Sequence, residues 1–278
     1  MRRRRTLAGP VSFEGVGLHY GQPARVVVSP YEGQGYLFVC GDERSPVEGL
    51  QLESGERGTA LVFPGGGRVQ TVEHLCAALR GLELDDVIVT FDGPEPPVLD
   101  GGAVLYGRRL MEIGIVEKDA ACEACSVTVP IIIESGDRLV AALPAENFRL
   151  SYVIDYDHPL IGTRRLSLAM TPAAFMAQIA PARTFCLERD LEAIKARGLA
   201  QGGTLENAVV VGDKGVLNPD GLRYDDEYVR HKILDFLGDL ALLGRPLRGH
   251  FLAIAAGHDL HQALVERIRP FVLKGRID

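Results

Sequence analysis

The 278-residue chain contains no tryptophan, and aromatic side chains of all kinds make up only 6% of it. Aliphatic side chains must therefore fill the core, since apolar residues still account for 46% and charged residues for 24%, as in ordinary globular proteins. Long apolar runs are missing as well. No window approaches the roughly 18 consecutive apolar residues of a membrane-crossing helix, so we expect no stable membrane insertion.

Basic residues are in deficit, with 30 Lys and Arg against 37 Asp and Glu and a formal net charge of −7. Nucleic-acid binders usually carry a basic footprint, so no nucleic-acid partner is expected. An anionic small substrate remains possible, because a few local cations can serve a pocket. The arginines at 2–5 are not followed by the apolar segment of a secretory signal, since Gly9, Pro10 and Glu14 interrupt at once. We expect a cytoplasmic protein, with a monomer as the default.

The cysteines are few, odd in number and scattered, which argues against a disulfide framework. They are Cys40, Cys76, Cys122, Cys125 and Cys186. Cys122 and Cys125 form a single CxxC without the second pair of a zinc finger. Two ordinary thiols are the simpler interpretation, and a redox or metal role is the alternative.

Short strands separated by Gly-rich turns alternate with helices along the chain. The patterns predict helices at 71–82, 105–113, 172–180, 188–197, 226–243 and 259–272, and strands at 24–28, 36–40, 59–63, 87–91, 127–133, 139–143, 150–154, 208–211 and 251–255. This mixture predicts an α+β fold with two domains, residues 1–120 and 121–278, each a sheet with helices on one face. The boundary should lie near residues 118–124.

The helix predicted at 226–243 is mostly apolar, yet His231, Asp235 and Asp239 recur every four residues and share one stripe. Buried carboxylates are costly unless they are paired or bind a metal. Taken alone, this spacing more often marks a solvent-facing stripe or an ion pair. The stripe is therefore a candidate metal site only if other ligands lie nearby.

A second pair, Glu73 and His74, falls in the first turn of the helix predicted at 71–82. Alone it fits a solvated helix start. His74 together with His231 and Asp235 would supply two imidazoles and one carboxylate, a set that suits a catalytic zinc with an open position for water. Glu73, one residue from a ligand, would then be well placed as a base. His258 follows Gly257 where a strand turns into a helix, and either acid–base work or a surface position fits it.

Several short segments, taken in order, resemble the bacterial UDP-3-O-acyl-N-acetylglucosamine deacetylase family, which acts early in lipid A synthesis. They are residues 15–19, 71–75, 94–96 with 100–101, 182–185, 209–210 with 216–218, 222–223, 227–235 and 257–258. Each motif is weak alone, but the ordered set is specific and covers nearly the whole chain. The resemblance implies two similar domains with the active site between them.

The resemblance also implies residue roles for zinc-dependent hydrolysis of an acetamide. His74, His231 and Asp235 would bind Zn²⁺, and Glu73 would be the general base. Thr184 would help to stabilise the oxyanion. His258 would be the general acid, with its pKa raised by Asp239 as a neighbouring carboxylate.

The substrate implied is a small molecule, a UDP-linked acylated amino sugar. Lys232, Phe185 and His19 would bind it, although Lys232 lies about 100° around the helix from the ligand stripe. The acyl chain would use a βαβ-type insert near 186–211. Plausible lining residues, which could instead simply pack the insert, are Leu187, Leu191, Ile194, Leu199 and Ala200. Cys186 stands where many relatives have glycine, which could alter the passage entrance.

Other functions fit parts of the pattern. A zinc amidohydrolase or deacetylase acting on another sugar nucleotide would keep the same zinc, base and acid. A zinc-stabilised binding module would normally have four ligands, often cysteines, which this set lacks. An interaction scaffold would leave the buried stripe of His231, Asp235 and Asp239 unexplained.

Overall fold

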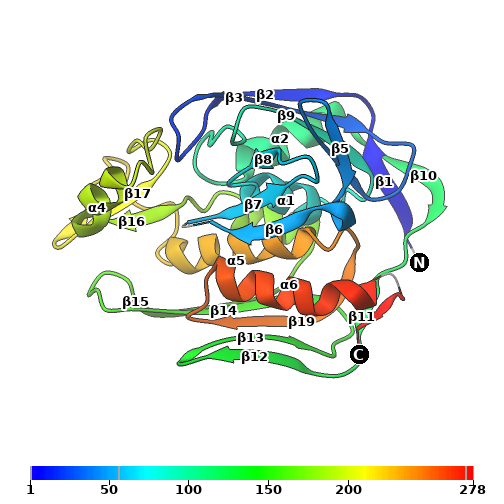
Figure 1. The fold of residues 1–278 in the computed structure, drawn as a ribbon. Coiled ribbons are helices and arrows are strands. Elements are labelled where there is room, and N and C mark those ends of the chain that lie inside the picture. Colours follow the sequence, from blue (N-terminus) through cyan, green and yellow to red (C-terminus); the bar gives the residue numbers. More distant parts are fainter. Residues whose placement is uncertain (1, 56, 273, 278) are drawn as a thin grey trace.

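The computed structural model describes residues 2–55, 57–272 and 274–277, and it confirms the predicted α+β class. Two sheets lie on opposite sides of a central group of helices (Figure 1). At the centre are α1 (Glu73–Gly81), α5 (Glu227–Ala241) and α6 (His258–Val272). Helix α1 comes from the part of the chain that builds one sheet, and it meets α5, which precedes the last long strand of the other sheet.

The first sheet is built from the early part of the chain. Its strand order is β2 (Val11–Val16), β3 (Pro23–Pro30), β9 (Val87–Asp92), β4 (Tyr36–Cys40) and β5 (Glu43–Pro46). Buried and more exposed residues alternate along β3, where Val26 and Val28 are fully buried. The sheet therefore has one face in the core.

The second sheet comes from the later part of the chain. Along one path its order is β12 (Ile131–Ser135), β13 (Arg138–Leu143), β19 (Leu247–Ile254), β11 (Cys125–Val127) and β20 (Arg276–Ile277), and β14 (Phe148–Tyr156) joins β19 to β15 (Gly162–Ala169). The prediction of a single strand at 127–133 is wrong. The chain forms β11 and β12 instead, and the break contains Pro130, which has no N–H to donate to a sheet ladder.

Smaller elements complete the fold. Two strands, β1 (Arg3–Leu7) and β10 (Ile115–Ala121), form a ribbon, while β6 (Gln51–Ser54), β7 (Thr59–Val62) and β8 (Arg68–Val69) form a small sheet. The short helices are η1 (Val47–Gly49), α2 (Val104–Ile113) and α3 (Pro172–Ala174), the last continuing into a π-helical turn, η2 (Phe175–Ile179). Most of these short strands carry no periodic pattern, and sequence reasoning missed them.

A separate unit projects beside the N-terminal end of α5 (Figure 1). Strand β16 (Phe185–Leu187) pairs in parallel with β17 (Val209–Gly212), and η3 (Glu188–Asp190) and α4 (Leu191–Ala196) lie between them in sequence. Strand β18 (Gly215–Val216) completes its sheet. The chain thus has a strand–helix–strand unit at the expected place.

Helices α1 and α5 pack closely, and Gly238 on α5 makes this possible. A Cβ atom at Gly238 would lie 2.1 Å from the carbonyl oxygen of Glu73. Any larger residue would therefore push the two helices apart. The absence of one side chain brings the start of α1, with Glu73 and His74, against the middle of α5.

The N-terminal arginines have a structural role. Arg4 pairs with Asp86, and Arg2 Nη1 lies 2.5 Å from Asp85 Oδ2. Both carboxylates are fully buried. These ion pairs hold the N-terminal ribbon against the turn between α1 and β9.

Some predictions about organisation are not decided by the structure. The two-domain division near residues 118–124 stays a prediction, as do the cytoplasmic location and the monomeric state. Among the described residues, no helix is both long and apolar enough to cross a membrane. All five cysteines are free thiols.

Candidate active site

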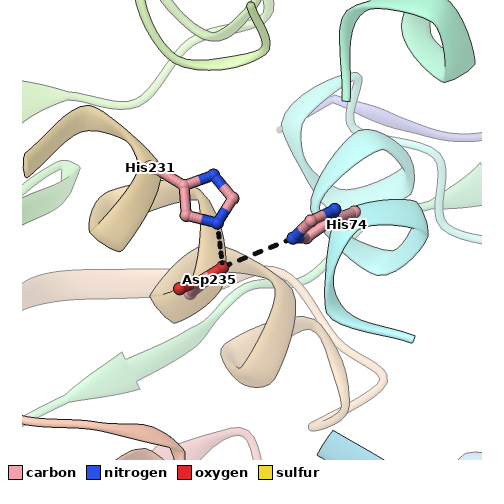
Figure 2. A group of neighbouring side chains, drawn as sticks. All are labelled: His74, His231 and Asp235. Atoms are coloured by element: carbon pink, nitrogen blue, oxygen red, sulfur yellow. Dashed lines mark ion pairs between the residues drawn. The ribbon is translucent and has the colours of Figure 1, made fainter. Parts of the chain in front are cut away.

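The two histidines and the aspartate predicted as metal ligands lie together. His74 points from the first turn of α1 toward α5, and both imidazoles face the Asp235 carboxylate (Figure 2). Asp235 Oδ1 lies 3.6 Å from His74 Nε2 and 3.2 Å from His231 Nε2. Ligands about 2.0–2.2 Å from a tetrahedral zinc are roughly 3.3–3.6 Å apart, so both distances to Asp235 suit a shared ion. The three ligand atoms all lie within 4.8 Å of one another.

The neighbours of His231 and Asp235 hold both side chains in place. His231 Nδ1 lies 3.1 Å from the carbonyl oxygen of Ala182, which directs Nε2 toward Asp235. Such an outer hydrogen bond is usual for a metal-binding imidazole. Burial opposes ionisation of Asp235, but His231 and Lys232 outweigh it and hold its pKa well below the ordinary value. Asp235 is therefore a carboxylate, the form that binds cations.

Lys232 is closer to the ligand stripe than its helical position suggests. Its Nζ donates to Asp235 Oδ2 at 2.9 Å. The long side chain thus bends back across the 100° offset between Lys232 and the ligand stripe. Burial lowers the pKa of Lys232, but Asp235 outweighs burial and raises it, so the ammonium stays charged.

Glu73 and His258 face each other beside this group. His258 Nε2 lies 3.8 Å from Glu73 Oε1 and 3.9 Å from Asp235 Oδ2. Burial raises the pKa of Glu73, although His258 and His74 partly offset this. Burial also lowers the pKa of His258, but Asp239 and Glu73 outweigh it and raise the pKa to about 9. A proton acceptor and a proton donor therefore lie side by side.

Asp239 is hydrogen-bonded to two imidazoles. Its Oδ2 lies 2.7 Å from His258 Nδ1 and 2.8 Å from His261 Nδ1. Burial raises the pKa of Asp239, but the charge of His258 outweighs this and lowers it to about 2. These three side chains also lie close enough to hold a metal. Because both Nδ1 atoms are already hydrogen-bonded to the carboxylate, the group is better suited to orienting His258.

A cavity of about 610 Å³ opens over these residues. Its polar end includes Glu73, His74, His231, Asp235 and His258. The other predicted site residues that line it are Thr184, Phe185, Lys232 and His19, whereas Asp239 lies behind His258. Its apolar end is formed mainly by the strand–helix–strand unit, with Cys186, Leu191, Ile194, Ala200, Leu205, Ala208 and Val210. One cavity thus joins a charged group to an aliphatic passage.

Comparisons with known proteins cover nearly the whole chain. Residues 4–269 match the family model described as UDP-3-O-acyl N-acetylglycosamine deacetylase. The chain belongs to this family. Proteins named UDP-3-O-acyl-N-acetylglucosamine deacetylase are similar to it: that of Anaeromyxobacter dehalogenans (strain 2CP-C) is 42% identical over 95% of this chain and 87% of its own length. Those of Anaeromyxobacter sp. (strain Fw109-5) and Myxococcus xanthus (strain DK1622) are each 41% identical, over 95% of this chain and 88% and 86% of their own lengths.

Only some of the residues predicted to line the apolar passage do line the cavity. Leu191, Ile194 and Ala200 line the cavity, as does Cys186. Leu187 and Leu199 are buried but are not among the lining residues, so they pack the unit onto its surroundings. Sequence spacing could not separate these two roles.

Sequence reasoning missed several residues that hold the site together. Thr59 donates its backbone N–H to Glu73 and its hydroxyl to Asp239, and no motif marks it. His261 is fully buried against Asp239. Its position three residues after His258, on the same helical face, was the available signal.

Glu95, which lies in the matching segment 94–96 but had no role assigned from the sequence, joins the start of α1 to the loop that carries His19. Its carboxylate accepts from the backbone N–H of His19 at 3.0 Å and from the Thr71 hydroxyl at 2.8 Å. Glu95 is almost fully buried, and burial raises its pKa, although these hydrogen bonds partly offset that effect. It therefore fixes His19 relative to Glu73 and His74.

A buried ion pair places Thr184. Arg183 Nε donates to Glu227 Oε1 at 2.9 Å, and the Arg183 backbone N–H donates to the same oxygen at 2.9 Å. Glu227 is the first residue of α5, one turn before His231. The pair therefore locks the segment that carries Thr184 and Phe185 to the helix that carries His231 and Asp235.

Proposed function

We propose that this chain hydrolyses the acetamide of a UDP-linked, 3-O-acylated N-acetylglucosamine, with zinc as cofactor, and releases acetate. One observation carries the proposal: three candidate ligand atoms, a carboxylate and an imidazole converge at the polar end of a cavity whose other end is aliphatic. The names of the relatives support the same substrate. The reaction is an early step of lipid A biosynthesis.

The donor set favours zinc over other common divalent ions. Two imidazole nitrogens and one carboxylate oxygen suit Zn²⁺, whereas Mg²⁺ and Ca²⁺ prefer sets made of oxygen. His74, His231 and Asp235 would hold the ion, and the two distances from the imidazoles to Asp235 suit a tetrahedral site. Zinc bound there supplies Lewis-acid polarisation of a carbonyl oxygen and makes water more acidic.

Glu73 and His258 divide the proton transfers between them. Glu73, with its pKa raised by burial, takes the proton of the attacking water. His258 is protonated at neutral pH, since its pKa is about 9, and it donates a proton to the amine nitrogen as the C–N bond breaks. Asp239 holds His258 Nδ1 at 2.7 Å, so Nε2 is the nitrogen that faces Glu73 and the cavity.

Thr184 lines the cavity, where its hydroxyl can donate to the carbonyl oxygen as negative charge develops there. The ion pair between Arg183 and Glu227 and the backbone hydrogen bond from Thr184 to Gly101 keep it in place. This charge appears mainly in the transition state, so the contact favours reaction more than binding.

The remaining lining residues recognise the substrate. The Lys232 ammonium provides a cation in a chain with an excess of acidic residues, which suits an anionic substrate. Phe185 offers an aromatic face, and its ring centroid lies 6.3 Å from that of His231. Burial lowers the pKa of His19 to about 4, so a neutral imidazole faces the sugar. The aliphatic passage receives the acyl chain, which a deacetylase acting on a sugar nucleotide without that chain would not need.

Acetate release from UDP-3-O-acyl-N-acetylglucosamine, measured with and without a metal chelator, tests the proposal. We expect acetate from the untreated protein, loss of activity with chelator, and recovery on adding zinc. The matched substrate without the 3-O-acyl group should react far more slowly. No acetate from the acylated substrate in the zinc-loaded protein would refute the function, and full activity after exhaustive chelation would refute the metal.

A further inference from the structure

Thr59 connects the two proton-carrying groups of the site. It is the first residue of β7 and is fully buried. Its backbone N–H donates to Glu73 Oε2 at 3.0 Å, and its hydroxyl donates to Asp239 Oδ1 at 2.6 Å. One residue thus binds one oxygen of each carboxylate and leaves the other oxygen, Glu73 Oε1 or Asp239 Oδ2, to face His258.

The direction of the Thr59 hydroxyl is fixed by its other neighbour. Gln262, on α6, donates its amide Nε2 to Thr59 Oγ1 at 3.0 Å. Because a hydroxyl has a single hydrogen, that hydrogen goes to Asp239. His258 Nδ1 lies 3.3 Å from Thr59 Oγ1 but only 2.7 Å from Asp239 Oδ2, so the carboxylate is its main partner.

These contacts restrict rotation of both carboxylates. Thr59 holds Oδ1 of Asp239. The carboxylate therefore cannot turn without also breaking the hydrogen bonds that join Oδ2 to His258 and His261. The backbone around Thr59 is equally constrained. A Cβ at Gly58 would lie 2.7 Å from Glu73 Oε1, so the chain there packs directly on the carboxylate.

We propose that Thr59 is a positioning residue that sets the placement of His258 relative to Glu73. The inference rests on the proposed deacetylation, in which these two side chains transfer the protons. Among the described residues, the hydrogen bonds between Thr59 and other side chains go to Glu73, Asp239, His258 and Gln262 rather than to the three candidate metal ligands, and Thr59 does not line the cavity. It therefore acts through Glu73 and Asp239, and its loss should change turnover more than substrate binding or metal content.

The test compares Thr59→Val, which keeps the shape but removes the hydroxyl, with Thr59→Ser, which keeps the hydroxyl. In the zinc-loaded protein we expect Thr59→Val to lower kcat by about 10²-fold, because small displacements of reacting groups cost roughly that much. KM and zinc content should stay near the wild-type values. Thr59→Ser should restore most of the lost kcat.

Thr6→Val is the matched control. Thr6 is also buried, and its hydroxyl likewise donates one hydrogen bond, to Asp86 O, and accepts one, from Tyr31 N. It lies on β1, outside the site. We expect this variant to lose stability to a similar extent while kcat is unchanged.

Several results would overturn the proposal. One is an unchanged kcat in Thr59→Val. Another is an equal fall of kcat in the control Thr6→Val. A third is a kcat in Thr59→Ser that stays as low as in Thr59→Val. If Thr59→Val does not fold, Thr59→Ala decides instead, because it also removes the hydroxyl that donates to Asp239; an unchanged kcat there rejects the idea. Lack of acetate release by the wild-type protein would instead refute the proposed function, so the two failures are distinguishable.

Discussion

Two groups of buried carboxylates in this chain are neutralised in different ways. Asp85 and Asp86 are paired with guanidinium and ammonium groups, from Arg2, Arg4, Arg80 and Lys118. In the candidate active site, Glu73, Asp235 and Asp239 face imidazoles and Lys232 instead.

The two groups differ in whether the partners of the carboxylates can change their charge. Arginine stays protonated at any ordinary pH, so the group around Asp85 has a fixed charge and joins the N-terminal ribbon to the core. Imidazoles can release a proton or bind a metal, and here they line a cavity. A buried carboxylate with permanent cations thus indicates a structural role, and one with titratable partners beside a cavity indicates a chemical role.

The largest effect on turnover should come from His74→Ala. With only His231 and Asp235 left, the site has too few ligands for a catalytic zinc. We expect zinc content to fall from about one per chain toward zero and acetate release to fall to background. Metal analysis of the purified variant measures this, with His250→Ala, on β19, as control. Full zinc occupancy in His74→Ala would reject the ligand assignment.

Glu73→Gln should have the next largest effect. It removes the proton acceptor but keeps the size of the side chain, so we expect zinc to remain while kcat falls by about 10²- to 10⁴-fold. Steady-state kinetics with metal analysis on the same sample measures both. Turnover equal to wild type would remove Glu73 from the mechanism.

His258→Gln should lower turnover by about 10²-fold and change its pH dependence. Since Asp239 and Glu73 raise the pKa of His258 to about 9, the acid form is present below that pH and is lost as the pH rises through it. The wild-type rate should therefore decline on the basic side near pH 9. The variant should lack this decline, and its persistence there would assign the acid role to another group.

Asp85→Asn should leave turnover per folded molecule unchanged and lower stability instead. Breaking a buried pair costs about 3–5 kcal/mol, because Arg2 and Arg80 lose their partner. Burial opposes ionisation of Asp85, but these arginines outweigh it and lower its pKa. The contribution of Asp85 to the free energy of unfolding is fully present above the unfolded-state pKa, and it is lost as the pH falls through the lower folded-state pKa.

Denaturant unfolding of Asp85→Asn at several pH values therefore tests the comparison. The difference in the free energy of unfolding between wild type and variant should be largest near neutral pH and should become smaller in acid. A difference that does not change with pH would show that the charge of Asp85 is not the cause of the lost stability. A fall in kcat for the folded variant would show that the two buried groups are not independent.

The sequence alone determined the long elements, because their periodicity is local. The apolar helix that became α5 and the alternating strand β14 lie where they were predicted, within a few residues at each end. The ordered motifs also identified the family. Short strands such as β6 and β8 have too few residues to show a period, and β11 and β12 were merged because the break at Pro130 was not recognised.

Tertiary structure alone decided how the side chains meet. No local pattern specifies that Gly238 lets α1 approach α5, yet this contact brings Glu73 and His74 to the stripe of His231 and Asp235. Nor does the sequence show that Thr59 binds Asp239, 180 positions away. The sequence thus supplied the reactive groups, and packing between distant segments set the distances on which their chemistry depends.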